Sequence, residues 1–182
     1  DTIQNNTAFG SADKTLASVI HAAELACIHD NIAAFPEQYQ TIVGERGVTL
    51  SGGQKQRSSI ARALMKTEAP VLILDDALSA VDTDTERSIL DNLRTIRGSG
   101  PDGQNERITI IIAHRISTIQ DADHILVLDD SHSQSAGGSI MAEYGTHDEL
   151  MAANGIYKSI FDKQQLEKQL REENPEGGES HV

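Results

Sequence analysis

The chain has 182 residues, of which 38% are hydrophobic and 24% are charged, with one cysteine and no tryptophan. These figures suit one α/β domain with a core of its own. A single cysteine excludes a disulfide scaffold, and no run approaches the roughly 18 consecutive apolar residues of a membrane-spanning helix. With 15 Lys and Arg against 28 Asp and Glu, the net charge of −13 argues against nucleic acid as a partner.

The first 70 residues are expected to be mainly helical. Apolar residues recur at helical spacing over about 14–30, and a short helix is expected near 31–35. Ser51 and Gln54 have the spacing of a capping box, in which each residue satisfies a backbone N–H group of the other. A helix is therefore expected from there to about residue 68.

The middle of the chain alternates between apolar runs and amphipathic stretches. Residues 71–74 and 108–113 are solid apolar runs, typical of strands buried on both faces of a parallel sheet. An amphipathic helix is expected over 85–96, followed by a loop rich in Gly at 98–106. With a third strand at 125–128, the order strand, helix, strand, helix, strand indicates crossover units in an α/β sheet.

The last third of the chain predicts a hairpin and two helices. Strand 125–128 is expected to pair with 140–144 across a Ser- and Gly-rich loop. Residues 146–149 repeat the capping-box spacing and open a short helix, and a longer helix is expected over about 156–172. Residues 166–182 are assigned to an acidic, disordered tail, and the disorder is expected above all in its Gly-containing end, 173–182.

Three polar features follow one another in the chain, and each has a use at a nucleotide. Ser51-Gly52-Gly53 precedes a helix, where free N–H groups and the helix dipole suit a phosphate. Asp75 and Asp76 end a buried strand, where a carboxylate can hold hydrated Mg²⁺. His114 follows the second buried strand and would emerge at the same sheet edge as Asp75 if the strands are parallel. Taken singly, they also fit an ordinary helix start, turn residues and a structural histidine.

Together these features resemble the nucleotide-binding domain of ATP-binding cassette (ABC) transporters. Leu-Ser-Gly-Gly-Gln-Lys-Gln-Arg matches the family's signature motif in full, and three further segments are similar to the Walker B strand, the D-loop and the switch-histidine loop. In order, the four segments are 50–57, 71–75, 79–82 and 113–115. Their spacing also fits, apart from a longer gap before the histidine that residues 98–106 explain as a surface insertion.

The resemblance implies a fold and a set of site residues. The fold is a P-loop NTPase-like α/β core, with residues 1–69 as the helical signature subdomain and 70–165 as the C-terminal part of the core. The resemblance implies that Asp76 and His114 are catalytic and that Asp75 binds Mg²⁺. The residues expected to contact ATP are Ser51, Gly52, Gly53, Gln54 and Asp82.

Part of the family's pattern is absent from these 182 residues. They contain no Gly-x₄-Gly-Lys-Ser/Thr string, which is the Walker A motif that holds the β- and γ-phosphates. The aromatic A-loop and the Gln-containing loop that precede the signature are not found either. The chain begins at Asp1 rather than Met. We therefore expect a piece of a cassette without its first strands, unable by itself to hydrolyse ATP.

The segment from Thr41 to Gly47, Thr-Ile-Val-Gly-Glu-Arg-Gly, resembles the X-loop of ABC exporters. In that family the X-loop contacts the transmembrane domains, so the resemblance implies an ATPase that drives export, on the cytoplasmic face of the cell membrane. A soluble ABC-type mechanical or regulatory ATPase is the alternative. The D-loop sequence argues against the translation-factor branch, and the lack of heptads argues against chromosome-maintenance ATPases.

Asp76 departs from the family, which places Glu directly after the Walker B Asp. That Glu acts on the attacking water, and an Asp carboxylate would lie roughly 1.5 Å short of its position. The same departure occurs in one subunit of heterodimeric exporters. In a dimer with a second cassette, Asp76 would weaken the ATP site built on this chain's own Walker B strand. Residues Ser51 to Gln54 would complete a competent ATP site on the partner cassette. The other interpretation is a tolerated variant in a slow homodimer.

Overall fold

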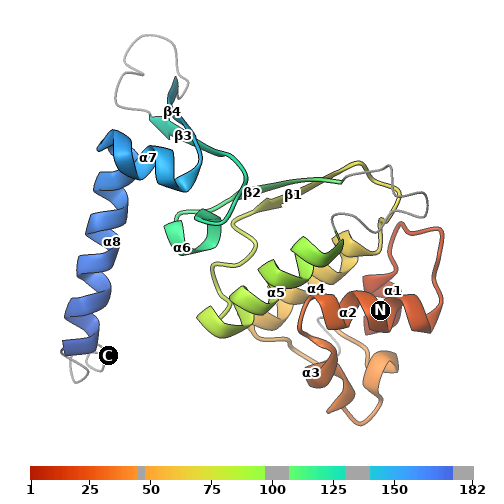
Figure 1. Cartoon of the computed structure of the whole chain (residues 1–182). Coiled ribbons are helices and arrows are strands. Elements are labelled where there is room, and N and C mark those ends of the chain that lie inside the picture. The colour runs from red at the N-terminus through yellow and green to blue at the C-terminus, as the bar shows by residue number, and fades with distance from the viewer. Residues whose placement is uncertain (45–47, 97–106, 130–139, 174–182) are drawn as a thin grey trace. The chain divides into compact units, whose positions relative to one another are not determined.

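The computed structural model describes residues 1–44, 48–96, 107–129 and 140–173 (Figure 1). The chain divides into two compact units, Asp1–Ala113 and His114–Val182. Each unit has its own cluster of buried apolar side chains. The predicted loops at 98–106 and 131–138 lie outside the described residues.

Short helices make up most of the first unit. Their bounds are α1 Ile3–Thr7, α2 Leu16–Leu25, α3 His29–Ala33, the 3₁₀ helix η1 Gln38–Gln40, α4 Gly52–Leu64 and α5 Thr83–Thr95. Helices α1, α2, α4 and α5 each begin at a side-chain oxygen that accepts a backbone N–H of the first turn. This capping satisfies one of the donors that a helix leaves unpaired at its start.

The single helix predicted over 14–30 is wrong. Helix α2 ends at Leu25, and α3 begins at His29. Between them Cys27 has a φ of 52°, a left-handed conformation that a continuous right-handed helix does not contain. Apolar residues on both sides of this turn, such as Ala23 and Ile32, are buried in the same cluster, so the apolar spacing continues through it and periodicity alone does not reveal the break.

The strands of the first unit confirm a parallel crossover. Strand β1 Val71–Asp75 pairs in parallel with β2 Ile108–Ile112, and α5 lies between them in the sequence. The expected burial on both faces is wrong for the described residues: Leu72 and Leu74 are buried, whereas Ile73 is 60% exposed. Figure 1 shows α4 and α5 on one side of the two strands, which explains the alternation.

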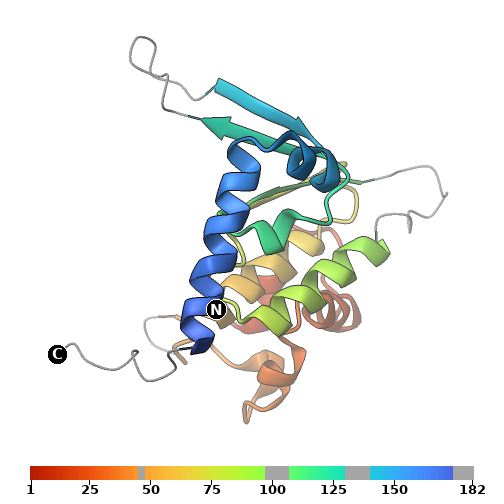
Figure 2. The same cartoon turned by 60° about the vertical axis from the view of Figure 1, so that its left-hand side comes forward.

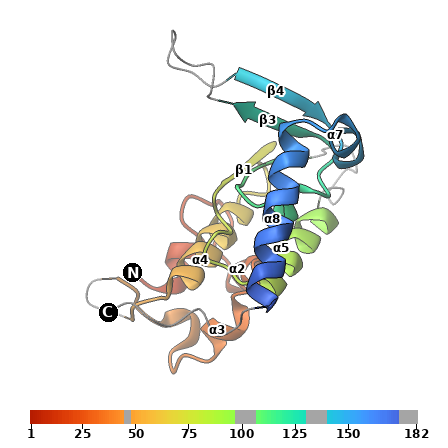
Figure 3. The same ribbon diagram turned by 90° about the vertical axis from the view of Figure 1, so that its left-hand side faces the viewer.

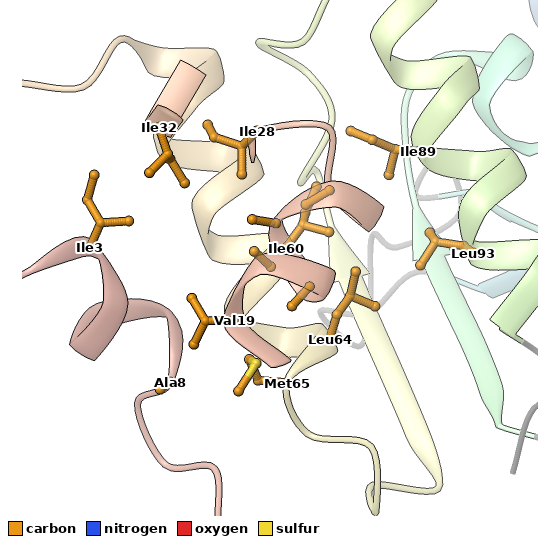
Figure 4. Packing of buried hydrophobic residues seen from close by; sticks show 14 of the residues in the cluster. Ile3, Ala8, Val19, Ile28, Ile32, Ile60, Leu64, Met65, Ile89 and Leu93 are labelled. Carbon is orange, nitrogen blue, oxygen red and sulfur yellow. The ribbon is translucent and has the colours of Figure 1, made fainter. Parts of the chain in front are cut away.

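Helix α4 lies at the centre of the first unit's core. Its Ile60 and Leu64 belong to the same buried cluster as Val19 of α2 and Ile89 of α5 (Figure 4). Its polar side also has defined contacts. The Arg57 guanidinium donates to the carbonyl of Cys27, and Arg62 Nε donates to that of Asn6 at 2.7 Å. These contacts fix the direction of α4, and therefore of the signature motif at its start.

The second unit contains the predicted hairpin. Strand β3 Ile125–Asp129 pairs antiparallel with β4 Ile140–Gly145, with an irregularity after Val127 (Figure 2). Among the described residues β3 pairs with β4 alone, so the expected second crossover is not observed. Helices α6 Ile116–Ile119, α7 His147–Ala153 and α8 Ile156–Glu173 complete the unit. Helix α6 lies where the predicted order of elements requires a helix between the second and third strands, although the sequence analysis gave no bounds for it.

Helix α8 extends beyond the start of the predicted tail. Residues 166–173 are helical, and 174–182 lie outside the described residues. The start of α8 is held by Glu143 of β4, whose two carboxylate oxygens accept the N–H groups of Ile156 at 2.8 Å and Tyr157 at 2.9 Å. In Figure 3 the strand pair, α7 and α8 are seen together. The negative charge of a carboxylate at this position also interacts favourably with the positive end of the helix dipole.

We expect Glu143→Gln to lower the free energy of unfolding by about 1 kcal/mol, because the amide NH₂ group that replaces one carboxylate oxygen cannot accept the N–H group facing it. Glu167→Gln, at an exposed position on the same helix, is the control and should leave stability unchanged. Urea denaturation measures both. Equal stability of the two variants would show that Glu143 does not hold the start of α8.

Candidate functional site

The start of α4 has the geometry predicted for the signature motif. Ser51 Oγ accepts the N–H of Gln54 at 3.3 Å, and Gln54 Oε1 accepts the N–H of Ser51 at 3.0 Å, so the capping box is confirmed. The N–H groups of Gly52 and Gly53 have no hydrogen-bond partner among the described residues. Two such donors at the positive end of a helix suit an anion.

Gly53 allows the D-loop to approach the signature motif closely. A Cβ atom at this position would lie 2.7 Å from the backbone oxygen of Ala80. A Cβ atom at Gly52 would lie 3.7 Å from the Ala80 side chain, which is an ordinary contact. Of the two glycines, therefore, Gly53 is the one required by packing. The structure brings the predicted signature and D-loop residues together at this point.

Gln56 ties α4 to the segment that follows β1. Its Nε2 atom donates to the carbonyl of Asp76 at 3.2 Å and to Ser79 Oγ at 2.9 Å. Its Oε1 atom accepts the N–H of Ala80 at 2.8 Å. The sequence places Gln56 in the signature motif but gives no sign of these contacts, because its partners lie 20 or more residues away.

Asp75, the last residue of β1, and Asp76, which follows it, are both exposed. Asp75 pairs in register with Ile112 at the end of β2, and the N–H of Asp76 donates to the Ile112 carbonyl at 3.0 Å. Asp76 has a φ of 47°, and Asp tolerates this left-handed conformation better than most residues. The carboxylates therefore follow the carboxyl end of a parallel strand, where α/β sheets bind ligands.

Asp82 has a structural role that the sequence analysis missed. Its Oδ1 atom accepts the N–H of Thr85 at 3.0 Å and so caps α5. This hydrogen bond favours the charged form and lowers the pKa of Asp82. An Asp directly before the start of an amphipathic helix is a recognisable capping signal, so this role could have been predicted. The assignment of Asp82 to ATP stays a prediction.

His114 is the first residue of the second unit and is exposed. The strands β1 and β2 are parallel, as the expectation for His114 required. Its position beside Asp75 stays a prediction, because the two residues belong to different units. Within the second unit, the backbone carbonyl of His114 accepts a hydrogen bond from Gln164 Nε2 at 2.7 Å.

The described part of the predicted X-loop lies against the N-terminus. The carbonyl of Thr41 accepts the N–H of Ile3 at 3.0 Å, and the N–H of Val43 donates to the carbonyl of Asp1 at 2.9 Å. Residues 45–47 lie outside the described residues. The contact of this loop with transmembrane domains stays a prediction.

Comparison with known proteins identifies the family of the chain. Residues 2–79 match the family model described as ABC transporter. Over 182 residues the chain is 47% identical to the multidrug resistance-like ATP-binding protein MdlA of Escherichia coli, covering all of this chain and 28% of that protein. The chain belongs to the ABC transporter family. It is also 47% identical to the ATP-dependent lipid A-core flippase of Shewanella frigidimarina, covering 90% of this chain and 25% of that protein.

A solved structure supports the same family and fold. The structure of a bacterial Atm1-family ABC exporter with ATP bound has a TM-score of 0.76 and 45% identity, covering 90% of this chain and 26% of that one. This ABC chain therefore has the ABC ATPase fold, and it spans about a quarter of the length of the proteins it matches. None of the helices in the described ranges combines the length and the hydrophobicity of a membrane-spanning segment.

We expect Gly53→Ala to lower the free energy of unfolding by roughly 1 to 3 kcal/mol, because the added methyl group must displace the backbone of Ala80. Gly52→Ala is the matched control and should change stability by less than about 0.5 kcal/mol. Thermal and urea unfolding of both variants make the comparison. If both alanines are tolerated equally, α4 and the D-loop do not approach as described.

Proposed function

We propose that this ABC chain is part of the ATP-hydrolysing nucleotide-binding domain of an exporter. The observation that carries the proposal is the exposed start of α4, where an intact capping box leaves the N–H groups of Gly52 and Gly53 free. The similarity to an export ATPase with ATP bound supports the same function. In this proposal the two N–H groups and Ser51 bind the terminal phosphate of ATP.

The remaining site residues fit ATP and Mg²⁺ by their chemistry. The exposed Asp75 carboxylate is the hard oxygen ligand that Mg²⁺ prefers, and Mg²⁺ bound with ATP neutralises charge on the phosphates. Asp76 would orient the attacking water, and His114 would contact the transferring phosphate. Gln54 and Asp82 would contribute to the nucleotide contacts from the ends of α4 and α5, where each already caps its helix.

We propose a second cassette as the partner. Each ATP would lie between the Walker motifs of one cassette and the signature motif of the other, so the signature of this chain completes a site on its partner. In a heterodimer, Asp76 would make the ATP site built on this chain's own Walker B strand hydrolyse ATP more slowly than the site on the partner cassette. The alternative is a slow homodimer in which Asp76 is a tolerated variant, since Asp is one of the residues that accept the left-handed conformation found at this position.

The proposed module couples ATP binding and hydrolysis to transport. Closure of two cassettes would move the segment from Thr41 to Gly47 against transmembrane domains, with the cassettes on the cytoplasmic face of the membrane. The relatives are named for multidrug resistance and for lipid A-core flipping. Export of a small molecule or lipid is therefore the class of activity that we propose, and the cargo is set by residues outside this chain.

The test uses the full-length protein with its partner cassette. We expect Ser51→Arg to abolish most ATP turnover, because the larger side chain blocks the phosphate at the start of α4. Asp76→Glu should raise turnover at this subunit's own site, because the carboxylate reaches roughly 1.5 Å further toward the water. Phosphate release measures both rates.

Ser59→Arg is the matched control, since Ser59 is an exposed residue two turns along the same helix. It should leave turnover unchanged. Full turnover in Ser51→Arg would overturn the proposed role of the signature motif. No gain in Asp76→Glu would favour the homodimer over the asymmetric pair.

A further inference from the structure

Gln164 of α8 binds the backbone on both sides of Arg115. Its Oε1 atom accepts the N–H of Ile116 at 2.9 Å, and its Nε2 atom donates to the carbonyl of His114 at 2.7 Å. The amide offers one acceptor and one donor, and each faces a backbone group of the opposite kind. A single side chain thus fixes two groups that flank one residue.

These two backbone groups need a partner from outside their own segment. Arg115 is the N-cap of α6 and forms no capping hydrogen bond with its side chain. The N–H of Ile116 is one of the donors that a helix leaves unpaired, and α6 is only four residues long. Such a short helix has little stability of its own. The orientation of the His114 backbone therefore depends on the contact with Gln164.

Helix α8 is well placed to hold this segment. Its first residues are bound by Glu143, and Tyr157 is 2% exposed, with its hydroxyl 2.8 Å from His147 Nδ1 of α7. Gln164 lies two turns further along the same helix. Because the start of α8 is anchored to β4 and α7, the amide of Gln164 reaches the His114 segment from a fixed support.

We propose that Gln164 is a positioning residue for His114. The inference rests on the proposed function, in which His114 contacts the transferring phosphate. By binding the carbonyl of His114 and the N–H of Ile116, Gln164 sets the direction in which the His114 side chain leaves the backbone. Misplacement of a catalytic group by about 1 Å can lower turnover by as much as a hundredfold, so the loss of this support should be visible in the rate.

The experiment compares Gln164→Ala, Gln164→Glu and Gln165→Ala in the full-length protein with its partner. Gln165 is next on the same helix, and its exposed side chain has no hydrogen-bond partner among the described residues. Gln164→Glu keeps the volume and the acceptor but cannot donate to the His114 carbonyl. A role in packing alone would survive this change.

Two measurements are made on each variant. In ATP hydrolysis, we expect both Gln164 variants to lower kcat about tenfold while KM for ATP changes less than twofold, and Gln165→Ala to match the wild type. In hydrogen–deuterium exchange, we expect faster exchange at the amide of Ile116 in Gln164→Ala and no change in Gln165→Ala.

Either of two results would overturn the inference: wild-type kcat in Gln164→Ala, or unchanged exchange at Ile116. A matching loss of kcat in Gln165→Ala would also overturn it, because the effect would then belong to the helix and not to the amide. If the wild-type protein itself hydrolyses no ATP, the proposed function fails. The exchange comparison still decides whether Gln164 holds the segment.

Discussion

The site in the first unit depends on the close contact between the start of α4 and the loop after β1. Gly53 permits the approach, since any Cβ atom there would lie 2.7 Å from the Ala80 backbone oxygen. Gln56 forms three hydrogen bonds across this contact, one each to Asp76, Ser79 and Ala80. These hydrogen bonds connect the signature motif to Asp76 and to the D-loop, which lie 20 or more residues after Gln56 in the chain.

The same helix links this contact to the core. Ile60 and Leu64 are buried with residues of α2, β1 and α5, while Arg62 binds the end of α1. A helix held along its length by packing presents its first N–H groups in a fixed direction, which avoids the cost of ordering them when an anion binds. The capping box has a complementary effect: it satisfies the N–H of Gln54 and leaves those of Gly52 and Gly53 free. Anion binding at this point does not require a positive net charge, and the chain carries −13.

Local features of the fold could be predicted from the sequence, and contacts between residues far apart in the sequence could not. The capping boxes at Ser51 and Thr146 and the hairpin of β3 with β4 are set by neighbouring residues, so they were predicted and are confirmed. The break at Cys27 and the left-handed backbone at Asp76 depend on how the surrounding elements pack, which no local pattern records. The amides of Gln56 and Gln164 bind partners far along the chain. A glutamine in a sequence carries no sign of which backbone it will reach.

A structure of the full-length protein with its partner cassette, ATP and Mg²⁺ would test most directly whether the start of α4 binds the terminal phosphate. We predict that the terminal phosphate of an ATP held by the Walker motifs of the partner lies within hydrogen-bond distance of the N–H groups of Gly52 and Gly53, with Gln56 still bound to Ala80. A closed dimer in which these N–H groups face solvent, or in which α4 has separated from the D-loop, would contradict it.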